Sequence, residues 1–169
     1  ELAEYLFNNS NASIRDIARL SENRLEMDRS YFVTLVESEE ESADINMQLV
    51  RSYLYECLKK DKFEAIPLTW SNTLAMVIPV CSNRDSFDEP LSWPAMIRYK
   101  AVLEKKFSLS LAQGGGRVYP LDELRKSFYE ARIALTLPRL LNEHHYVQKF
   151  SDLGIYYPIF CQSPQDIKS

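Results

Sequence analysis

The chain has 169 residues, of which 46% are hydrophobic and 26% are charged. These values are ordinary for a globular protein, so they favour a packed domain and argue against a disordered chain. The formal net charge is −4, and no stretch is dense in lysine and arginine. A DNA-binding domain needs such a basic surface for the phosphates, so this segment itself is not expected to bind DNA. No apolar run is long enough to cross a bilayer.

The cysteines and histidines do not suggest a metal or catalytic site. Cys57, Cys81 and Cys161 are widely spaced, form no CxxC pair and have no histidine at metal-ligand spacing. We interpret them as reduced thiols of a cytoplasmic protein, and we expect no cofactor. The only histidines, His144 and His145, are adjacent and have no assignable nucleophile, so we expect them at the surface.

The first half of the chain predicts a helical lead-in, a strand and a helix. Residues 1–28 are expected to form the lead-in, with Ser13 as a candidate helix cap. The run YFVTLV at residues 31–36 is apolar, aromatic and β-branched, which predicts a buried central strand. Residues 43–60 carry apolar side chains at three- and four-residue steps, which predicts an amphipathic helix.

A hairpin is predicted next. Residues 63–70 and 74–80 are two extended runs, and the polar residues Ser71-Asn72-Thr73 lie between them, although this is not a tight Asn-Gly turn. Pro67 has no amide proton to donate, so the first of these strands should lie at a sheet edge. The second strand is almost wholly apolar from Leu74 to Ile78 and should be central.

The second half predicts two more helices and two more strands. Residues 92–107 should form a helix, with Ser92 as a plausible cap and Pro94 in the first turn. Alternation around residues 108–111 predicts a half-buried strand, which is followed by three glycines. The remaining predictions are a helix from Leu121 that Pro138 kinks or ends, a short strand at 146–150, and a closing helix or turn at 155–160.

The predicted order is β-α-β-β-α-β, followed by a helix and a short strand. This is an α+β fold of the ferredoxin-like, split βαβ type with an antiparallel sheet. In that topology the first and third strands are central and the second is an edge, which agrees with the position of Pro67. We therefore divide the chain into the lead-in 1–28, a domain at 29–160 and a polar tail at 161–169.

The second half of the chain resembles a known family. The segment GGRVYPLDELRKSFYEARIAL begins at Gly115, and HYVQKFSDLGIYYPI follows it. Both are similar to the GGDEF-like domain of PucR/CdaR-type regulators of purine catabolism and sugar-diacid use. Such domains show a glycine-arginine turn, an "L..L..S...A..AL" helix and a closing "F.DLG.Y" segment. The matching residues are Gly116, Arg117, Tyr119, Leu124, Ser127, Tyr129, Ala131, Ala134, Leu135, Phe150, Asp152, Leu153, Gly154 and Tyr156.

The resemblance implies a cytoplasmic bacterial transcription regulator. Members of that family carry a variable N-terminal sensing region, this middle domain and a C-terminal helix-turn-helix. We therefore interpret the chain as a piece of a longer regulator, whose DNA contacts belong to a segment outside it. The expected partners are the other domains of the parent, and a second copy of the chain is a further candidate. The middle domain of a two-component response regulator is an open alternative, which only the flanking sequence would decide.

The resemblance also implies diguanylate cyclases as the nearest catalytic relatives. Their Gly-Gly-Asp/Glu-Glu-Phe hairpin needs glycines for close approach of a nucleotide and carboxylates for metal ions. The corresponding segment here, residues 70–75, contains neither glycine nor carboxylate. Glu37 is the nearest equivalent of the metal-binding aspartate that follows the first strand. We therefore expect no catalytic activity and name no catalytic residue.

Four residues remain as ligand candidates. The run Gly114–Gly116 fits neither a P-loop nor a Rossmann fingerprint, and we interpret it as a turn between strand and helix. The amides of Gly115 and Gly116, together with Arg117, are candidates for binding an anionic effector. Glu37, at the start of an acidic run to Glu41, is a candidate cation ligand, although such runs are usually solvated loops.

Two surfaces have open interpretations. The predicted solvent face of the last long helix provides either solubility or a docking face for other domains or a second copy. Its residues are Glu123, Arg125, Lys126, Glu130 and Arg132. The apolar side chains Tyr156, Tyr157, Ile159 and Phe160 either close the core or form a patch covered by another segment.

The resulting hypothesis is a non-catalytic module for signal relay or dimerisation in a transcription regulator. The alternative is a sensor that binds a small effector, such as an acidic metabolite, between the sheet and the helices. A nucleotide cyclase is the third possibility.

Overall fold

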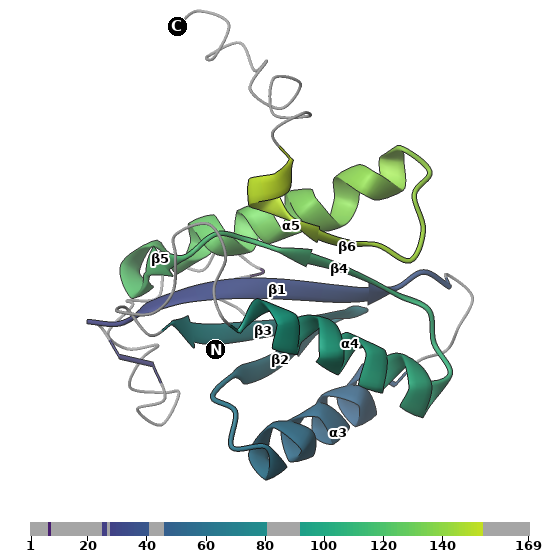
Figure 1. Ribbon diagram of the computed structural model, residues 1–169, viewed down its shortest axis with the longest axis horizontal. Coiled ribbons are helices and arrows are strands. Elements are labelled where there is room, and N and C mark those ends of the chain that lie inside the picture. Colours follow the sequence, from purple (N-terminus) through teal and green to yellow (C-terminus); the bar gives the residue numbers. More distant parts are fainter. Residues whose placement is uncertain (1–6, 8–24, 27, 41–45, 81–91, 154–169) are drawn as a thin grey trace, which may run out of the picture.

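The computed structural model describes residues 7, 25–26, 28–40, 46–80 and 92–153 (Figure 1). Apart from the two-residue strand β5 and two 3-10 turns, the strands and helices of this part of the chain follow one another in the predicted order. The elements are β1 (Ser30–Ser38), α3 (Met47–Lys60), β2 (Ile66–Trp70), β3 (Thr73–Val80), α4 (Trp93–Phe107), β4 (Leu111–Gly115), β5 (Tyr119–Pro120), the 3-10 turn η1 (Leu121–Glu123), α5 (Leu124–Leu140), β6 (Val147–Lys149) and the 3-10 turn η2 (Phe150–Asp152).

The strands form one sheet in the order β2-β3-β1-β4-β6. The β2-β3, β3-β1 and β1-β4 pairs are antiparallel, and β6 is added parallel to β4. The short strand β5 pairs with the first two residues of β1. This is the predicted split βαβ arrangement: β1 and β3 are internal, and β2 with Pro67 is an edge.

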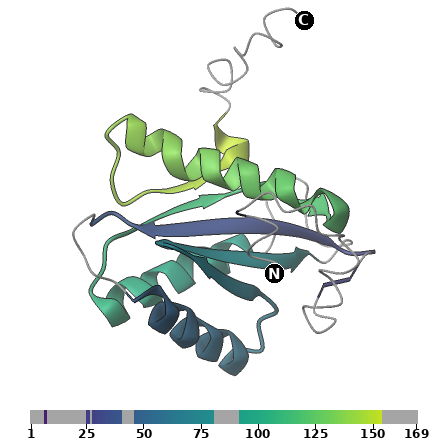
Figure 2. The same cartoon turned by 180° about the vertical axis from the view of Figure 1, so that it is seen from behind.

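Helices cover both faces of the sheet. In Figures 1 and 2, α5 lies along one face while α3 and α4 lie on the other. Alternate side chains of β1 divide between the two layers, because successive residues of a strand point to opposite faces. Tyr31, Val33 and Leu35 pack with α5, whereas Phe32 and Val36 pack with α3 and α4. Burial on both faces explains why this strand reads as an unbroken apolar run.

Two helix starts differ in their chemistry. The side chain of Asn46 caps α3 by accepting a hydrogen bond from the amide of Gln48. Ser92 occupies the N-cap position of α4 as predicted, but its side chain makes no capping hydrogen bond to the helix. Pro94 lies in the first turn of α4 as predicted, where its missing amide proton costs nothing.

The expectations for β4 and its glycines are corrected. Strand β4 covers residues 111–115 instead of the predicted 108–111, and all five of its residues are buried, so it is covered on both faces rather than half-buried. Gly114 and Gly115 belong to the strand instead of a turn, and no described glycine has a positive φ. A Cβ on Gly114 would lie 2.5 Å from the amide nitrogen of Leu135, and one on Gly115 would lie 2.3 Å from the Trp93 ring. The glycines therefore permit close packing on both faces rather than a bend.

The remaining elements need only small adjustments. Pro138 lies in the last turn of α5, and the helix continues to Leu140. Strand β6 falls inside the predicted range 146–150. Of the lead-in 1–28 only Phe7, Leu25, Glu26 and Asp28 are described, and the predicted element at 155–160 lies outside the described residues. Among the described helices, none combines the length and apolarity needed to traverse a bilayer.

Candidate functional site

The site begins at a break in the hydrogen bonding along β1. Residues 34–38 of this strand pair with β4, and Ser30 and Tyr31 pair with β5. Between these two ladders the carbonyl of Val33 accepts a 2.9 Å bond from the amide of Gly116. The amide of Val33 donates to the hydroxyl of Ser127 on α5, also at 2.9 Å. A buried helix hydroxyl thus replaces the missing strand partner, as a buried amide requires.

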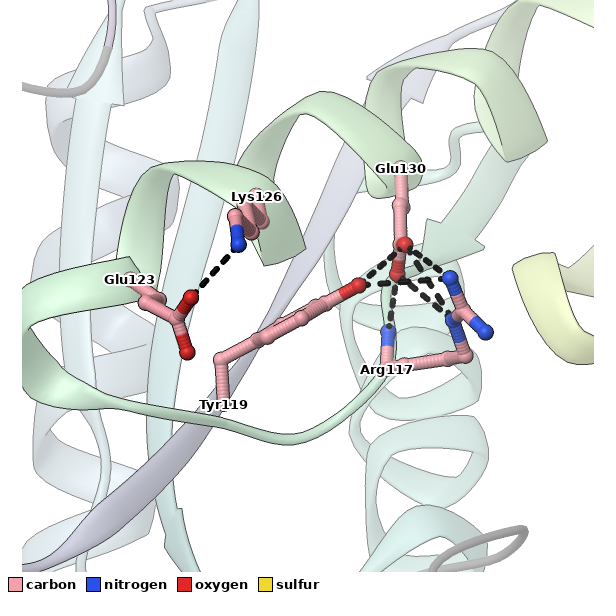
Figure 3. A network of polar contacts seen from close by, with 5 residues as sticks. All are labelled: Arg117, Tyr119, Glu123, Lys126 and Glu130. Carbon is pink, nitrogen blue, oxygen red and sulfur yellow. Dashed lines mark hydrogen bonds and ion pairs between the residues drawn. The ribbon is translucent and has the colours of Figure 1, made fainter.

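Close approach of α5 makes this bond possible. A Cβ on Gly116 would lie 2.0 Å from the carbonyl oxygen of Ser127, so only glycine lets the two backbones come so near. The chain then leaves the sheet with the side chain of the next residue, Arg117, directed at α5 (Figure 3). The glycine thereby fixes where the arginine lies.

Arg117, Tyr119 and Glu130 form a hydrogen-bonded group, which we name the Arg117 cluster (Figure 3). Glu130 Oε1 accepts from the backbone amide of Arg117 at 3.0 Å and from its Nε at 3.2 Å. Glu130 Oε2 accepts from Arg117 Nη2 at 2.7 Å and from the Tyr119 hydroxyl at 2.5 Å. The carboxylate therefore joins the segment after β4 to the middle of α5 through four donors.

The prediction that Glu130 lies on the solvent face of the helix is wrong. Its side chain is only 10% exposed, whereas that of Arg117 is 49% exposed. Sequence periodicity placed a carboxylate outside because charged residues are rarely buried, yet a paired and fully hydrogen-bonded one can be. The motif residues Gly116, Arg117, Tyr119 and Ser127 are all used in this attachment of α5.

The pKa values of two members of the cluster, Arg117 and Tyr119, are raised. Hydrogen bonds from Arg117 to Glu130 raise the pKa of the guanidinium above its ordinary value, so it stays charged. Burial, and then the hydrogen bond to Glu130, raise the pKa of Tyr119 to about 12. Burial and a hydrogen bond to Asp61 likewise raise the pKa of Tyr99 to about 12.

We expect the protein to lose stability as the pH rises from about 10 to about 12, because both tyrosines hold their protons more tightly when folded. Their contribution is complete below the unfolded pKa of about 10 and disappears as the pH passes the folded pKa. Urea unfolding across this range should show a smaller loss in Tyr119→Phe and in Tyr99→Phe. An unchanged alkaline loss in the double variant would contradict the assignment.

An elongated groove lies beside the Arg117 cluster, along α5. Its volume is about 730 Å³, and we name it the α5 groove. It is continuous with a second hollow of about 250 Å³ toward the end of the helix, because Tyr129, Arg132 and Ile133 line both. The lining of the α5 groove is Phe7, Arg117, Tyr119, Arg125, Lys126, Phe128, Tyr129, Glu130, Arg132, Ile133 and Phe150.

Cations in the groove lie over aromatic rings. Arg117 is 5.1 Å from the centre of the Phe150 ring, and Arg132 is 5.9 Å from that of Phe128. The ring of Phe7, which also lines the groove, contacts that of Phe128 edge-on at 4.8 Å and stacks on Trp70 at 5.8 Å. The groove therefore combines aromatic walls with positive charge, a pairing that sequence periodicity did not predict.

Glu37 lies apart from the other ligand candidates. It is opposite Thr73 of the β2-β3 hairpin, and its carboxylate is 3.9 Å from Arg139. Glu37 is four residues along β1 from Val33, whose carbonyl binds the amide of Gly116. At the usual rise per residue of a strand, Glu37 and Val33 are roughly 13 Å apart. The structure therefore brings Gly115, Gly116 and Arg117 to one place and leaves Glu37 at another.

The hairpin opposite Glu37 is tighter than expected. Trp70 pairs with Thr73, so only Ser71 and Asn72 form the loop. Ser71 has a φ of 56°, a conformation that glycine usually adopts at the first position of a two-residue hairpin loop. The sequence signal was missed because serine is an uncommon choice there.

Sequence reasoning also missed a contact between Glu39, Ser110 and His145. The Ser110 hydroxyl donates to Glu39 Oε2 at 2.9 Å and lies 2.7 Å from His145 Nδ1. The hydroxyl of Ser110 thus connects the carboxylate of Glu39 with the imidazole ring of His145. His145 is largely exposed, as predicted, and the group ties together the loops around β1 and β4.

The described part of the chain contains no cluster of side chains that could bind a metal ion. Across residues 7, 25–26, 28–40, 46–80 and 92–153, no three histidine, cysteine or carboxylate groups lie close enough to hold an ion. The two features described above are the hydrogen-bonded attachment of α5 to the sheet and the groove lined by cations and aromatic rings.

Comparison with known proteins identifies the family. A family model described as a GGDEF-like domain matches residues 8–137, more than half of the chain. The chain belongs to the GGDEF-like domain family. A search of curated proteins gave no match. In this GGDEF-like domain the matched range includes residues 8–28, which we had assigned to the lead-in, and it ends within α5.

Proposed function

We propose that this GGDEF-like domain is a non-catalytic regulatory module, which relays a signal or dimerises within a bacterial transcription regulator of the PucR/CdaR type. The observation that carries this proposal is the Arg117 cluster. Four of the residues on which the family resemblance rests, Gly116, Arg117, Tyr119 and Ser127, help to attach α5 to the sheet. In this proposal the protein is cytoplasmic, and DNA is contacted by another segment of the parent.

The hairpin supports the non-catalytic part of the proposal. The loop between β2 and β3 is Ser71-Asn72, so it offers a nucleotide neither glycine nor carboxylate. The nearest carboxylate on β1, Glu37, already has Arg139 as a counter-ion at 3.9 Å. Diguanylate cyclase chemistry needs carboxylates free to hold metal ions near the phosphates.

A nucleotide turnover assay tests this part. Incubation of the chain with GTP or ATP and Mg²⁺ or Mn²⁺ should give no cyclic nucleotide, with an active diguanylate cyclase as the positive control. Product formation that is lost in Glu37→Gln would overturn the non-catalytic proposal.

The relay and dimerisation part needs separate measurements. Multi-angle light scattering should detect dimers whose fraction grows with protein concentration, and a strict monomer at high concentration would contradict dimerisation. In the parent regulator, Arg117→Gln should change the transcriptional response while leaving DNA affinity unchanged. An unaltered response would contradict relay through this cluster.

An effector sensor is the second candidate, and the α5 groove favours it. A groove of about 730 Å³ with aromatic walls and a few polar groups has the size and composition of ligand sites. A thermal-shift survey of metabolites distinguishes a sensor from a relay alone, because a bound ligand raises the unfolding temperature by mass action.

A further inference from the structure

We infer that the α5 groove binds a small organic anion with a flat apolar body, and that Arg132 contacts the anionic group. This inference rests on the sensor form of the proposed function, and it specifies the chemical class of the effector.

The apolar body of the ligand is indicated by the walls. Phe7, Phe128, Tyr129 and Phe150 line the groove, and Tyr129 is 68% exposed although it is a large aromatic residue. Ile133 connects this region to the second hollow, where Leu137 and the exposed Leu140 continue the apolar surface. Flat rings stack well against such walls, and each adds contact area with little loss of side-chain freedom.

The anionic group is indicated by the balance of charge. Four cations and one carboxylate line the groove, although the whole chain has a net charge of −4. That carboxylate, Glu130, already accepts hydrogen bonds from Arg117 and Tyr119. The groove lining therefore carries an excess of positive charge, of which Glu130 offsets Arg117, and Glu123, which does not line the groove, offsets Lys126.

Arg132 is better placed to bind the ligand than Arg117 or Lys126. Arg117 is held by Glu130, and Lys126 is 2.5 Å from Glu123. Arg132 makes no ion pair with any residue that the structure describes, and its guanidinium lies over the face of the Phe128 ring. A guanidinium on an aromatic ring keeps its planar fork of donors directed outward, which suits a carboxylate, sulfonate or phosphate.

The size of the groove and the charge of the chain limit the ligand to a small molecule. A volume of about 730 Å³ lies within the range of small-molecule sites, roughly 300 to 1,000 Å³. A long polyanion such as nucleic acid would extend beyond the groove over a chain of net charge −4, which repels it.

A ligand in the α5 groove would contact the residues that attach α5 to the sheet. The groove contains Arg117, Tyr119 and Glu130, so an occupant touches the same residues that join the helix to the break in β1. A ligand that makes different contacts when this cluster is intact or open would shift the equilibrium between the two states. The groove and the relay element are therefore physically continuous.

The test uses two fluorescent probes that differ in charge. The anionic probe is 1-anilinonaphthalene-8-sulfonate, and the neutral probe is N-phenyl-1-naphthylamine, which has the same ring system without the sulfonate. The variants are Arg132→Gln, Arg132→Lys and Tyr129→Ala. The matched control is Arg98→Gln on α4, because Arg98 also lies over a ring, that of Tyr99 at 5.3 Å, on the other face of the sheet.

The expected result is saturable one-to-one binding of the anionic probe. Its affinity should fall about tenfold in Arg132→Gln, as for loss of one charge-assisted hydrogen bond, with partial recovery in Arg132→Lys. The neutral probe should be insensitive to Arg132→Gln, and both probes should weaken in Tyr129→Ala. The Arg98→Gln control should bind both probes like the unaltered chain.

Two outcomes would overturn the inference. One is anionic-probe binding that Arg132→Gln and Arg98→Gln reduce equally, and the other is the absence of saturable binding. Circular dichroism of every variant ensures that the probe reports a folded groove rather than a loosened core. Neither outcome affects the turnover assay or the relay measurement, so failure here is distinguishable from failure of the proposed function.

Discussion

Replacing Gly116 with alanine should destabilise the protein by about 3 kcal/mol, at the upper end of the usual cost of overpacking. The added Cβ would lie 2.0 Å from the carbonyl oxygen of Ser127, which belongs to a helix backbone and has no rotamer to change. Relief requires α5 to move away, and that movement stretches the bonds from Ser127 to Val33 and from Glu130 to Arg117. Urea unfolding measures the loss as a lower midpoint with an unchanged slope.

The neighbouring glycines provide the matched comparison. Gly114→Ala also meets the α5 backbone, at 2.5 Å from the nitrogen of Leu135, so it should cost a similar amount. Gly115→Ala instead meets the ring of Trp93 at 2.3 Å, and Trp93→Phe removes the ring atoms involved. A double-mutant cycle should therefore show strong rescue for Gly115→Ala with Trp93→Phe. It should show additive losses when Trp93→Phe is combined with Gly116→Ala.

If Gly116→Ala unfolds at the same urea concentration as the unaltered chain, α5 does not lie as close to β4 as described. Rescue of Gly116→Ala by Trp93→Phe would also contradict the geometry, because the two residues contact different layers.

Glu130→Gln should destabilise the protein by about 2 kcal/mol. Breaking a buried ion pair usually costs roughly 3 to 5 kcal/mol, and the half-exposed Arg117 lowers that figure because water still solvates it. The glutamine retains the shape of the side chain but has no charge and only one acceptor oxygen. The amide and guanidinium of Arg117 and the hydroxyl of Tyr119 would then compete for that oxygen.

Glu123→Gln is the control, because Glu123 pairs with Lys126 on the exposed side of the same region. Loss of this exposed pair should change stability by no more than about 0.5 kcal/mol. Urea unfolding of both variants at neutral pH measures the difference. Equal losses in the two variants would mean that the Arg117 cluster does not hold α5.

Much of the fold followed from local patterns. The apolar run at Tyr31–Val36 predicted a central strand, and Pro67 predicted an edge strand, because a proline removes one ladder hydrogen bond. The stripe Val50, Leu54 and Leu58 predicted the buried face of α3. These signals are local because burial repeats with the period of the element itself.

The sequence alone therefore determined the order of the main strands and helices and the central and edge positions in the sheet. It also indicated a GGDEF-like family, through a motif that includes Gly116 and Arg117. Only the tertiary structure decided that Glu130 is buried, that Gly114–Gly116 permit contact with helices rather than a turn, and that Arg132 and Tyr129 line one groove. The physical reason is that these properties depend on contacts between residues distant in the chain. Periodicity reports which side of an element is apolar, whereas a buried carboxylate or a forbidden Cβ depends on what another element brings to it.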